Sequence, residues 1–354
     1  MQQYNFNNHK LIYHFDRVNE FIKEGGCYPL YMEISPIGIC NHRCIFCAYD
    51  YIDYPDRRLE TTRLLNFIDE VSANGLKSLL FAGEGEPLLH PDIDKFIIKA
   101  KENNIDTGVF TNGHKLKKEL SEKILPGLSF IRFSFNGGTK EVYSQIHNAG
   151  LKVYDRVVQN IRDAVLVRSN LKLSVDIGAQ YVLIPENLNA VVNAAQTLRD
   201  TGIDYFVVKP FMQRQFQSYK MKMNFDRKSV NEIFNKLEML SNESFNVIIR
   251  KEFFSDNGRR NYDHCYGTSF ITVLNSAGDL SSCLPYWDQK EFSFGNIYEN
   301  SFSEIWLGEK RKKVTEHLEK EMMVQNCPPL CRQNDINNFL WEIKNPTVKH
   351  INFI

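Results

Sequence analysis

Between residue 30 and about residue 210, short apolar runs alternate with amphipathic stretches. The apolar runs cover residues 30–36, 78–83, 106–113, 129–138, 173–185 and 204–210. The segments between them have helical spacing near 61–74, 91–103, 115–123, 154–168 and 187–201. Such an alternation is typical of βα repeats around a parallel sheet. A closed barrel of eight units needs about 250 residues, so the pattern predicts an α/β fold with a partial, open (β/α)6 barrel.

The flanking segments follow other patterns. Apolar positions in residues 11–22 recur at helical spacing, which predicts a capping helix within residues 1–29. We assign residues 30–225 to the barrel, 226–263 to a connecting helical segment, and 264–354 to a small α+β extension. In the extension, residues 268–283 read as a hairpin with a turn near Ser276–Asp279. The final "HINFI" predicts an apolar tail that packs back on the body.

Composition limits the partners and the compartment. The chain has 354 residues, with 43 basic and 43 acidic side chains. This balance gives no electrostatic footprint for duplex nucleic acid or an anionic membrane. We find no apolar run long enough to span a bilayer and no secretory signal at the start, so we expect a cytoplasmic protein. In a reducing compartment, the eight cysteines are not expected to form disulfides, and those that are clustered are expected to bind metal.

Three of these cysteines share one short loop. Cys40, Cys44 and Cys47 follow the first predicted strand, with three and then two residues between them. Three thiolates can hold three irons of a 4Fe–4S cluster, which leaves the fourth iron open to a small molecule. The alternative is a zinc site completed by His42 or by a distant residue.

This loop resembles the signature of the radical S-adenosylmethionine (SAM) superfamily. The resemblance implies that the three cysteines hold a 4Fe–4S cluster and that SAM chelates the open iron. It also implies that Phe46, before the last cysteine, lies near the adenine. An enzyme of this kind cleaves SAM reductively to a 5′-deoxyadenosyl radical, which takes a hydrogen atom from the substrate.

A second element follows the second predicted strand. The stretch "AGEGEP" resembles the glycine–glutamate–proline element of the same superfamily. Gly83 and Gly85 allow close backbone approach, and Pro87 favours an extended Glu86 that can accept hydrogen bonds from an ammonium group of SAM. An ordinary turn has the same composition. Glu84 is an extra residue between the glycines, so which glycine lies closest to SAM stays open.

Polar residues also end the third and fourth strands. Thr111 and Asn112 in "TNG", and Ser134 and Asn136 in "FSFNGG", match positions where relatives contact the carboxylate and ribose of SAM. Relatives often carry aspartate where this chain has Asn136. Turn chemistry is the alternative explanation, because Asn-Gly pairs commonly end strands.

The other clustered cysteines lie in the extension. Cys265, Cys283, Cys327 and Cys331 resemble the ligand set of SPASM and twitch extensions, with "GNIYENSFSEIW" between the two pairs. The chain has no spare cysteines for two clusters, so we expect the shorter twitch type with one auxiliary 4Fe–4S cluster. Three residues rather than two separate the last pair, and His264 is an alternative ligand. A structural zinc ribbon is the other possible use of these thiols.

The resemblance implies the reaction class but leaves the substrate open. Only 39 residues precede Cys40, which is too short for the leader-peptide recognition domain that many peptide-modifying relatives carry at the N-terminus. We therefore expect a small polar substrate, such as a sugar or nucleotide derivative. Lys209 and Arg214, at the end of the sixth strand, are candidate contacts for an anionic group, although both also suit a solvated surface. Cys27 is either a hydrogen-atom donor or, as is more common, a buried thiol without a role.

Three functions remain in competition. The first is a radical SAM enzyme with an auxiliary cluster that assists electron transfer, giving net oxidation or epimerisation. It would use a one-electron donor such as flavodoxin or ferredoxin. The second is a peptide- or protein-modifying enzyme of the same superfamily, and the third is a zinc-binding scaffold protein.

Overall fold

A single ten-stranded sheet organises the molecule. The computed structural model describes residues 9–221, 227–254, 260–328 and 331–353. The strands pair in the order β10-β9-β8-β1-β2-β3-β4-β5-β6-β7. From β1 to β7 all neighbours are parallel and follow chain order. These strands are β1 (Tyr31–Ile34), β2 (Ser78–Phe81), β3 (Asp106–Thr111), β4 (Phe130–Ser134), β5 (Asp176–Leu183), β6 (Tyr205–Pro210) and β7 (Asn246–Ile249).

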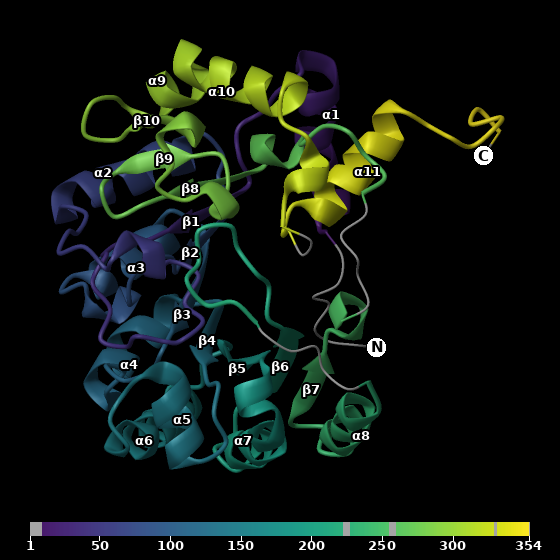
Figure 1. Ribbon diagram of the computed structural model, residues 1–354. Coiled ribbons are helices and arrows are strands. Elements are labelled where there is room, and N and C mark those ends of the chain that lie inside the picture. Colours follow the sequence, from purple (N-terminus) through teal and green to yellow (C-terminus); the bar gives the residue numbers. More distant parts are fainter. Residues whose placement is uncertain (1–8, 222–226, 255–259, 329–330, 354) are drawn as a thin grey trace.

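Helices cover one face of this sheet. Figure 1 shows them along the outside of the arc of parallel strands. They are α2 (Thr61–Ala73), α3 (Ile93–Glu102), α4 (Lys118–Ile124), α5 (Lys140–His147), α6 (Lys152–Asn170), α7 (Val191–Arg199) and α8 (Arg227–Glu238). In α2, for example, the buried side chains Leu64, Phe67, Ile68 and Val71 recur at helical spacing, so one stripe of the helix faces the sheet.

The alternation of side chains along each strand separates the main core from a second face. Met32 and Ile34 of β1, and Phe206 and Val208 of β6, belong to the main apolar core shared with the helices. Because successive side chains of a strand point to opposite faces, the residues between them face away from the helices. We call this second face, on the concave side of the sheet, the lumen.

The predicted partial barrel is confirmed, with one more parallel strand than expected. β7 lies in the segment that was expected to be a helical connection, and it pairs with β6. Its four residues are only partly buried at the end of the sheet, which explains why its apolar pattern is weak. The predicted boundary at residues 225/226 lies outside the described residues.

The extension continues the sheet beyond β1. It contains β8 (Ile271–Leu274), β9 (Asp279–Ser281), β10 (Ser293–Asn296), α9 (Phe302–Leu307), α10 (Glu309–Lys320) and α11 (Asn334–Lys344). β8 and β9 form an antiparallel hairpin, and β8 also pairs in parallel with β1. The extension is therefore joined to the barrel by strand pairing.

The helix near the start of the chain packs on this extension. In α1 (Phe15–Glu24), Val18 and Phe21 share an apolar cluster with Phe270 and Leu340. The expectation of a packed tail is wrong, because Phe353 is 86% exposed and the end of the chain extends away from the body (Figure 1). No helix in the described part of the chain is both long enough and apolar enough to cross a bilayer.

Candidate cofactor and metal sites

The three cysteines after β1 lie on a loop that is fixed by backbone hydrogen bonds. The amide of Cys47 donates to the carbonyl oxygen of Cys44 over 3.0 Å, and the amide of Ile45 donates to that of Ile146 over 2.9 Å. Burial raises the pKa of the Cys40 thiol to about 12, and it also raises the pKa of Cys44 and Cys47. Metal ligation therefore has to displace three thiol protons, which couples metal loading to pH.

A histidine from another element contacts this loop. His147, the last residue of α5, has its Nδ1 atom 3.2 Å from Cys44 Sγ. Its Nε2 atom accepts a hydrogen bond from the amide of Asn136 over 3.1 Å. Sequence analysis missed His147 because the residue lies 103 positions after Cys44 and matches no motif.

Glu86 is the centre of a polar network beside the cysteine loop. Its carboxylate accepts hydrogen bonds from the amide of Leu88 (3.1 Å), the hydroxyl of Thr111 (2.6 Å) and the amide of Asn112 (2.8 Å). Burial raises the pKa of Glu86 to about 7, although these three bonds act against the shift. Pro87 begins the short helical turn that Glu86 caps. Contacts of Glu86, Pro87 and Thr111 with SAM stay predictions.

Asn112 connects this network to the cysteines. Its side-chain amide donates to Asn41 Oδ1 over 2.8 Å and lies 4.0 Å from Cys40 Sγ. The predicted cofactor residues Glu86, Thr111 and Asn112 are thus brought together beside the first cysteine.

Asn136 and Ser134 lie differently. The side-chain oxygen of Asn136 accepts a hydrogen bond from the amide of Val182 over 2.7 Å. Asn136 therefore joins β4 to β5 and orients His147, while a contact with SAM stays a prediction. Ser134 ends β4 beside Gln180 of β5. Phe46 packs near Phe211, with ring centroids 6.4 Å apart.

The two glycines of the second motif make close approaches to the protein itself. A Cβ atom on Gly85 would lie 2.1 Å from the carbonyl oxygen of Ile37 in the cysteine loop. One on Gly83 would lie 2.7 Å from Ser35 and 3.0 Å from the Trp287 ring. These positions need glycine so that the second strand end can pack against the first, and proximity to SAM remains a prediction.

Glu84, the extra residue between these glycines, joins the barrel to the extension. Trp287 Nε1 donates to its carboxylate over 2.6 Å, and the amide of Ser276 donates over 3.0 Å. Arg57 lies 3.3 Å away, and the Glu84 side chain is 1% exposed. The insertion that looked like a departure from the motif is thus an interdomain contact.

The second set of cysteines gathers in the extension. The charge of Cys331 raises the pKa of Cys265, Cys283 and Cys327, and the charge of Cys265 also raises that of Cys283, so the four thiols lie close together. Burial is the largest cause of the raised pKa in all of them. Asn337 donates to Cys265 Sγ over 3.4 Å. The four thiols suit one complete tetrathiolate site.

A mononuclear metal is the alternative occupant beside the first set of cysteines. His42, Cys44 and His147 place ligand atoms within 4.8 Å of one another. However, both ring nitrogens of His147 are already used, by Cys44 and by Asn136. Three thiols on one fixed loop fit an iron–sulfur cluster with one position left for another ligand. His42, whose buried ring nitrogens have no partner among the described residues, remains unassigned.

The other predicted residues are separated. Lys209 lies in the lumen near the end of β6, and Arg214 in the following loop donates to the carbonyl oxygen of Leu284 over 3.2 Å. Cys27 precedes β1 whereas the cysteine loop follows it, so the two lie at opposite ends of this strand. The Cys27 thiol is buried and donates to Ser269, which favours a packing role over hydrogen donation.

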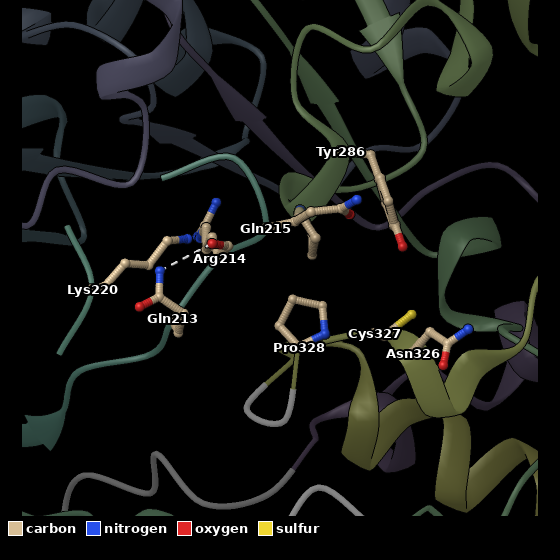
Figure 2. A pocket seen from close by; sticks show the side chains of 9 residues that line it. Gln213, Arg214, Gln215, Lys220, Tyr286, Asn326, Cys327 and Pro328 are labelled. Atoms are coloured by element: carbon tan, nitrogen blue, oxygen red, sulfur yellow. Dashed lines mark hydrogen bonds between the residues drawn. The ribbon is translucent and has the colours of Figure 1, made fainter. Parts of the chain in front are cut away.

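A cavity of about 590 Å³ lies between the loop after β6 and the extension. Figure 2 shows Gln213, Arg214 and Lys220 on one side, and Tyr286, Cys327 and Pro328 on the other. One of the four extension thiols thus lines an opening beside the barrel.

Comparisons with known proteins agree with this geometry. Residues 34–198 match the radical SAM superfamily, and residues 265–333 match the SPASM family, described as an iron–sulfur cluster-binding domain. The tungsten-containing aldehyde ferredoxin oxidoreductase cofactor-modifying protein of Pyrococcus furiosus is 22% identical over 79% of this chain and 81% of its own length.

Solved structures with the same fold were also found. SuiB of Streptococcus suis bound to S-adenosylmethionine has a TM-score of 0.66, with 18% identity over 95% of this chain and 79% of that chain. SuiB bound to precursor peptide SuiA has a TM-score of 0.64, with 18% identity over 88% and 74% of the two chains. At this identity, the likeness establishes the fold alone.

Proposed function

Because the chain belongs to the radical SAM superfamily and carries a C-terminal iron–sulfur domain, we propose that it acts on a small polar molecule. It is an enzyme that uses SAM and 4Fe–4S clusters. When bound, these cofactors supply a 5′-deoxyadenosyl radical that takes a hydrogen atom from the substrate. The observation that carries the proposal is the cysteine loop after β1, with Cys40, Cys44 and Cys47 beside the polar network of Glu86.

The residues of the chain have distinct tasks in this proposal. The three loop cysteines hold the cluster that binds SAM. Glu86 and Asn112 fix the end of β3 next to that loop, and Phe46 lies beside the adenine. The apolar contact between Phe46 and Phe211 helps to exclude water from a reactive radical.

The cavity supports a small substrate. Binding sites for small molecules have volumes of about 300–1,000 Å³, and the cavity beside Arg214 and Cys327 has a volume of about 590 Å³. An auxiliary cluster held by the extension thiols would lie next to this cavity and could accept an electron from a substrate radical. Loss of that electron and of a proton would give net oxidation, whereas epimerisation would require a hydrogen atom to be returned to the substrate radical. Flavodoxin or ferredoxin in the cytoplasm would supply the first electron.

A second candidate is modification of a peptide. It is favoured by the likeness to SuiB bound to a precursor peptide. The substrate of the cofactor-modifying relative is a different kind of molecule, so the family alone does not decide. The zinc scaffold has no such support, because residues 34–198 match the radical SAM superfamily and residues 265–333 match an iron–sulfur cluster-binding domain.

The test is anaerobic incubation of the reconstituted holoenzyme with SAM and dithionite. We expect 5′-deoxyadenosine and methionine, and no product from Cys44→Ala. Cys27→Ala is the control, because this thiol lies at the other end of β1. If the wild type binds SAM but never forms 5′-deoxyadenosine, the proposed chemistry is wrong. Deuterium transfer from candidate metabolites, compared with peptide pools, then distinguishes the two substrate classes.

A further inference from the structure

A lysine in the lumen has no partner among the residues that the structure describes. Lys209 lies between the positions of β6 that face the core, since Phe206 and Val208 belong to the core. Its side chain is only partly exposed. Within the described residues, its ammonium group makes neither a hydrogen bond nor an ion pair. A partly buried cation without a partner is unfavourable unless a ligand supplies the counter-charge.

Four arginines lie close enough to Lys209 for their charges to act on it. Burial lowers the pKa of Lys209 to about 7, and the charges of four arginines lower it further. These arginines come from β4, from the loop after β6, from the residue after β7, and from the segment before α11. They are Arg132, Arg214, Arg250 and Arg332. Five cations from separate elements thus converge on one part of the lumen.

Several of these arginines are held in place by other residues. Arg332 pairs with Glu33 over 2.7 Å. Arg132 donates to the Tyr205 hydroxyl over 3.2 Å, with its guanidinium 4.8 Å from the centroid of the Phe110 ring. These contacts hold both arginines in place before any ligand arrives, although Glu33 offsets the charge of Arg332. A preorganised site of this kind favours ligand binding.

We propose that Lys209 is the central contact of a binding site for an oxyanion group, either phosphate or carboxylate, carried by the substrate. This inference rests on the proposed function and narrows its substrate to an anionic molecule. The ammonium of Lys209 would donate charge-assisted hydrogen bonds to the oxyanion. The surrounding arginines would attract it over a longer range.

The place of this site relative to the cysteines fits a substrate. Arg214 donates to the carbonyl oxygen of Leu284, the residue after Cys283, and its guanidinium carbon lies 5.2 Å from the centroid of the Tyr49 ring, two residues after Cys47. Arg332 follows Cys331 directly in the chain. An oxyanion held by Lys209 therefore anchors a substrate in the space that both sets of cysteines approach.

The test measures binding of simple anions to the SAM-loaded holoenzyme by anaerobic calorimetry. The probes are pyrophosphate, malonate and glycerol. We expect one of the two anions to bind and glycerol not to bind. Lys209→Met should weaken anion binding at least tenfold, while Lys209→Arg retains part of it. Lys152→Met, an exposed lysine of α6, is the matched control and should bind like the wild type.

A measurement on the wild type alone covers the case in which Lys209→Met does not fold. Lys209 should react with acetic anhydride near neutral pH, and the bound anion should protect it, as read by mass spectrometry. The inference is overturned if neither anion binds, or if anion binding leaves Lys209 unprotected and the Met variant unaffected. Formation of 5′-deoxyadenosine without added substrate does not need this site. A wild-type protein that forms no 5′-deoxyadenosine would therefore count against the proposed function and not against the anion site.

Discussion

His147 Nδ1 lies 3.2 Å from Cys44 Sγ, and the direction of this hydrogen bond is fixed by the other side of the ring. Burial lowers the pKa of His147 well below its ordinary value, so the imidazole is neutral and carries one proton. Since Nε2 accepts from the amide of Asn136, the proton is on Nδ1 and is donated to the cysteine sulfur. Hydrogen bonds to cluster sulfurs are one of the means by which proteins set iron–sulfur potentials.

The first prediction is that His147→Phe lowers the reduction potential of the cluster on the cysteine loop. The bond to sulfur stabilises the more negative, reduced state. Loss of this hydrogen bond should lower the potential by roughly 40 mV for each 1 kcal/mol by which the bond favours the reduced cluster over the oxidised one. This is the conversion for a one-electron couple. The measurement is a redox titration of the holoenzyme followed by electron paramagnetic resonance.

Tyr143→Phe is the matched control for this prediction. Tyr143 stacks on the same ring, with centroids 4.1 Å apart, but does not take part in the bond to sulfur. The cluster of the Tyr143→Phe variant should have the same reduction potential as that of the wild type. A His147→Phe protein with an unchanged potential would mean that the bond does not act on the loaded cluster.

The second prediction concerns Glu84 and the contact between barrel and extension. Glu84→Ala removes a buried carboxylate that holds Trp287 and Ser276 of the extension and leaves Arg57 without this partner. Arg57 keeps Asp288 as a partner, so the cost comes mainly from the buried donors of Trp287 and Ser276, each left unsatisfied at about 1–3 kcal/mol. We expect a lower denaturation midpoint and faster release of iron from the extension, whereas Glu316→Ala on exposed α10 should show neither effect. Equal midpoints for both variants would contradict the structural role of Glu84.

His147 and Glu84 show what the sequence could and could not predict. The alternating pattern predicted six strands in the right order, since each βα unit has a strong local pattern. The short β7 escaped because four partly buried residues give little periodicity. The cysteines and Glu86 were found through their spacing. His147 and Glu84 act through contacts across 103 and 203 positions, and such contacts leave no local pattern.

The third prediction concerns the pH dependence of stability. The pKa of Lys209 is about 7 in the folded protein and about 10.4 in an unfolded chain. Between these values the unfolded state binds more protons, so this residue makes the folded protein more stable as pH rises. The contribution is at most about 1.4 kcal/mol per pH unit.

Denaturation midpoints of the wild type and Lys209→Met at pH 7, 8 and 9 measure this contribution. The charges that act on Lys209 are those of Arg132, Arg214, Arg250 and Arg332, and Glu33 pairs with Arg332. The Met variant should therefore gain less stability with pH than the wild type. Parallel pH profiles would show that Lys209 has an ordinary pKa in the folded protein.

The fourth prediction is that the two sets of cysteines hold separate clusters. The wild type should contain about eight irons, four for each 4Fe–4S cluster, and Cys283→Ala should retain about four. Because Cys283 belongs to the extension, this variant should still form 5′-deoxyadenosine from SAM without added substrate. Cys327→Ala tests whether all four thiols are needed, and an equal loss of iron is expected because Cys327 interacts with Cys331 in the same group. In the wild type, the Cys27 thiol donates to the Ser269 carbonyl oxygen, so Cys27→Ala should keep all eight irons. A Cys283→Ala protein that also kept eight irons would exclude Cys283 as a ligand.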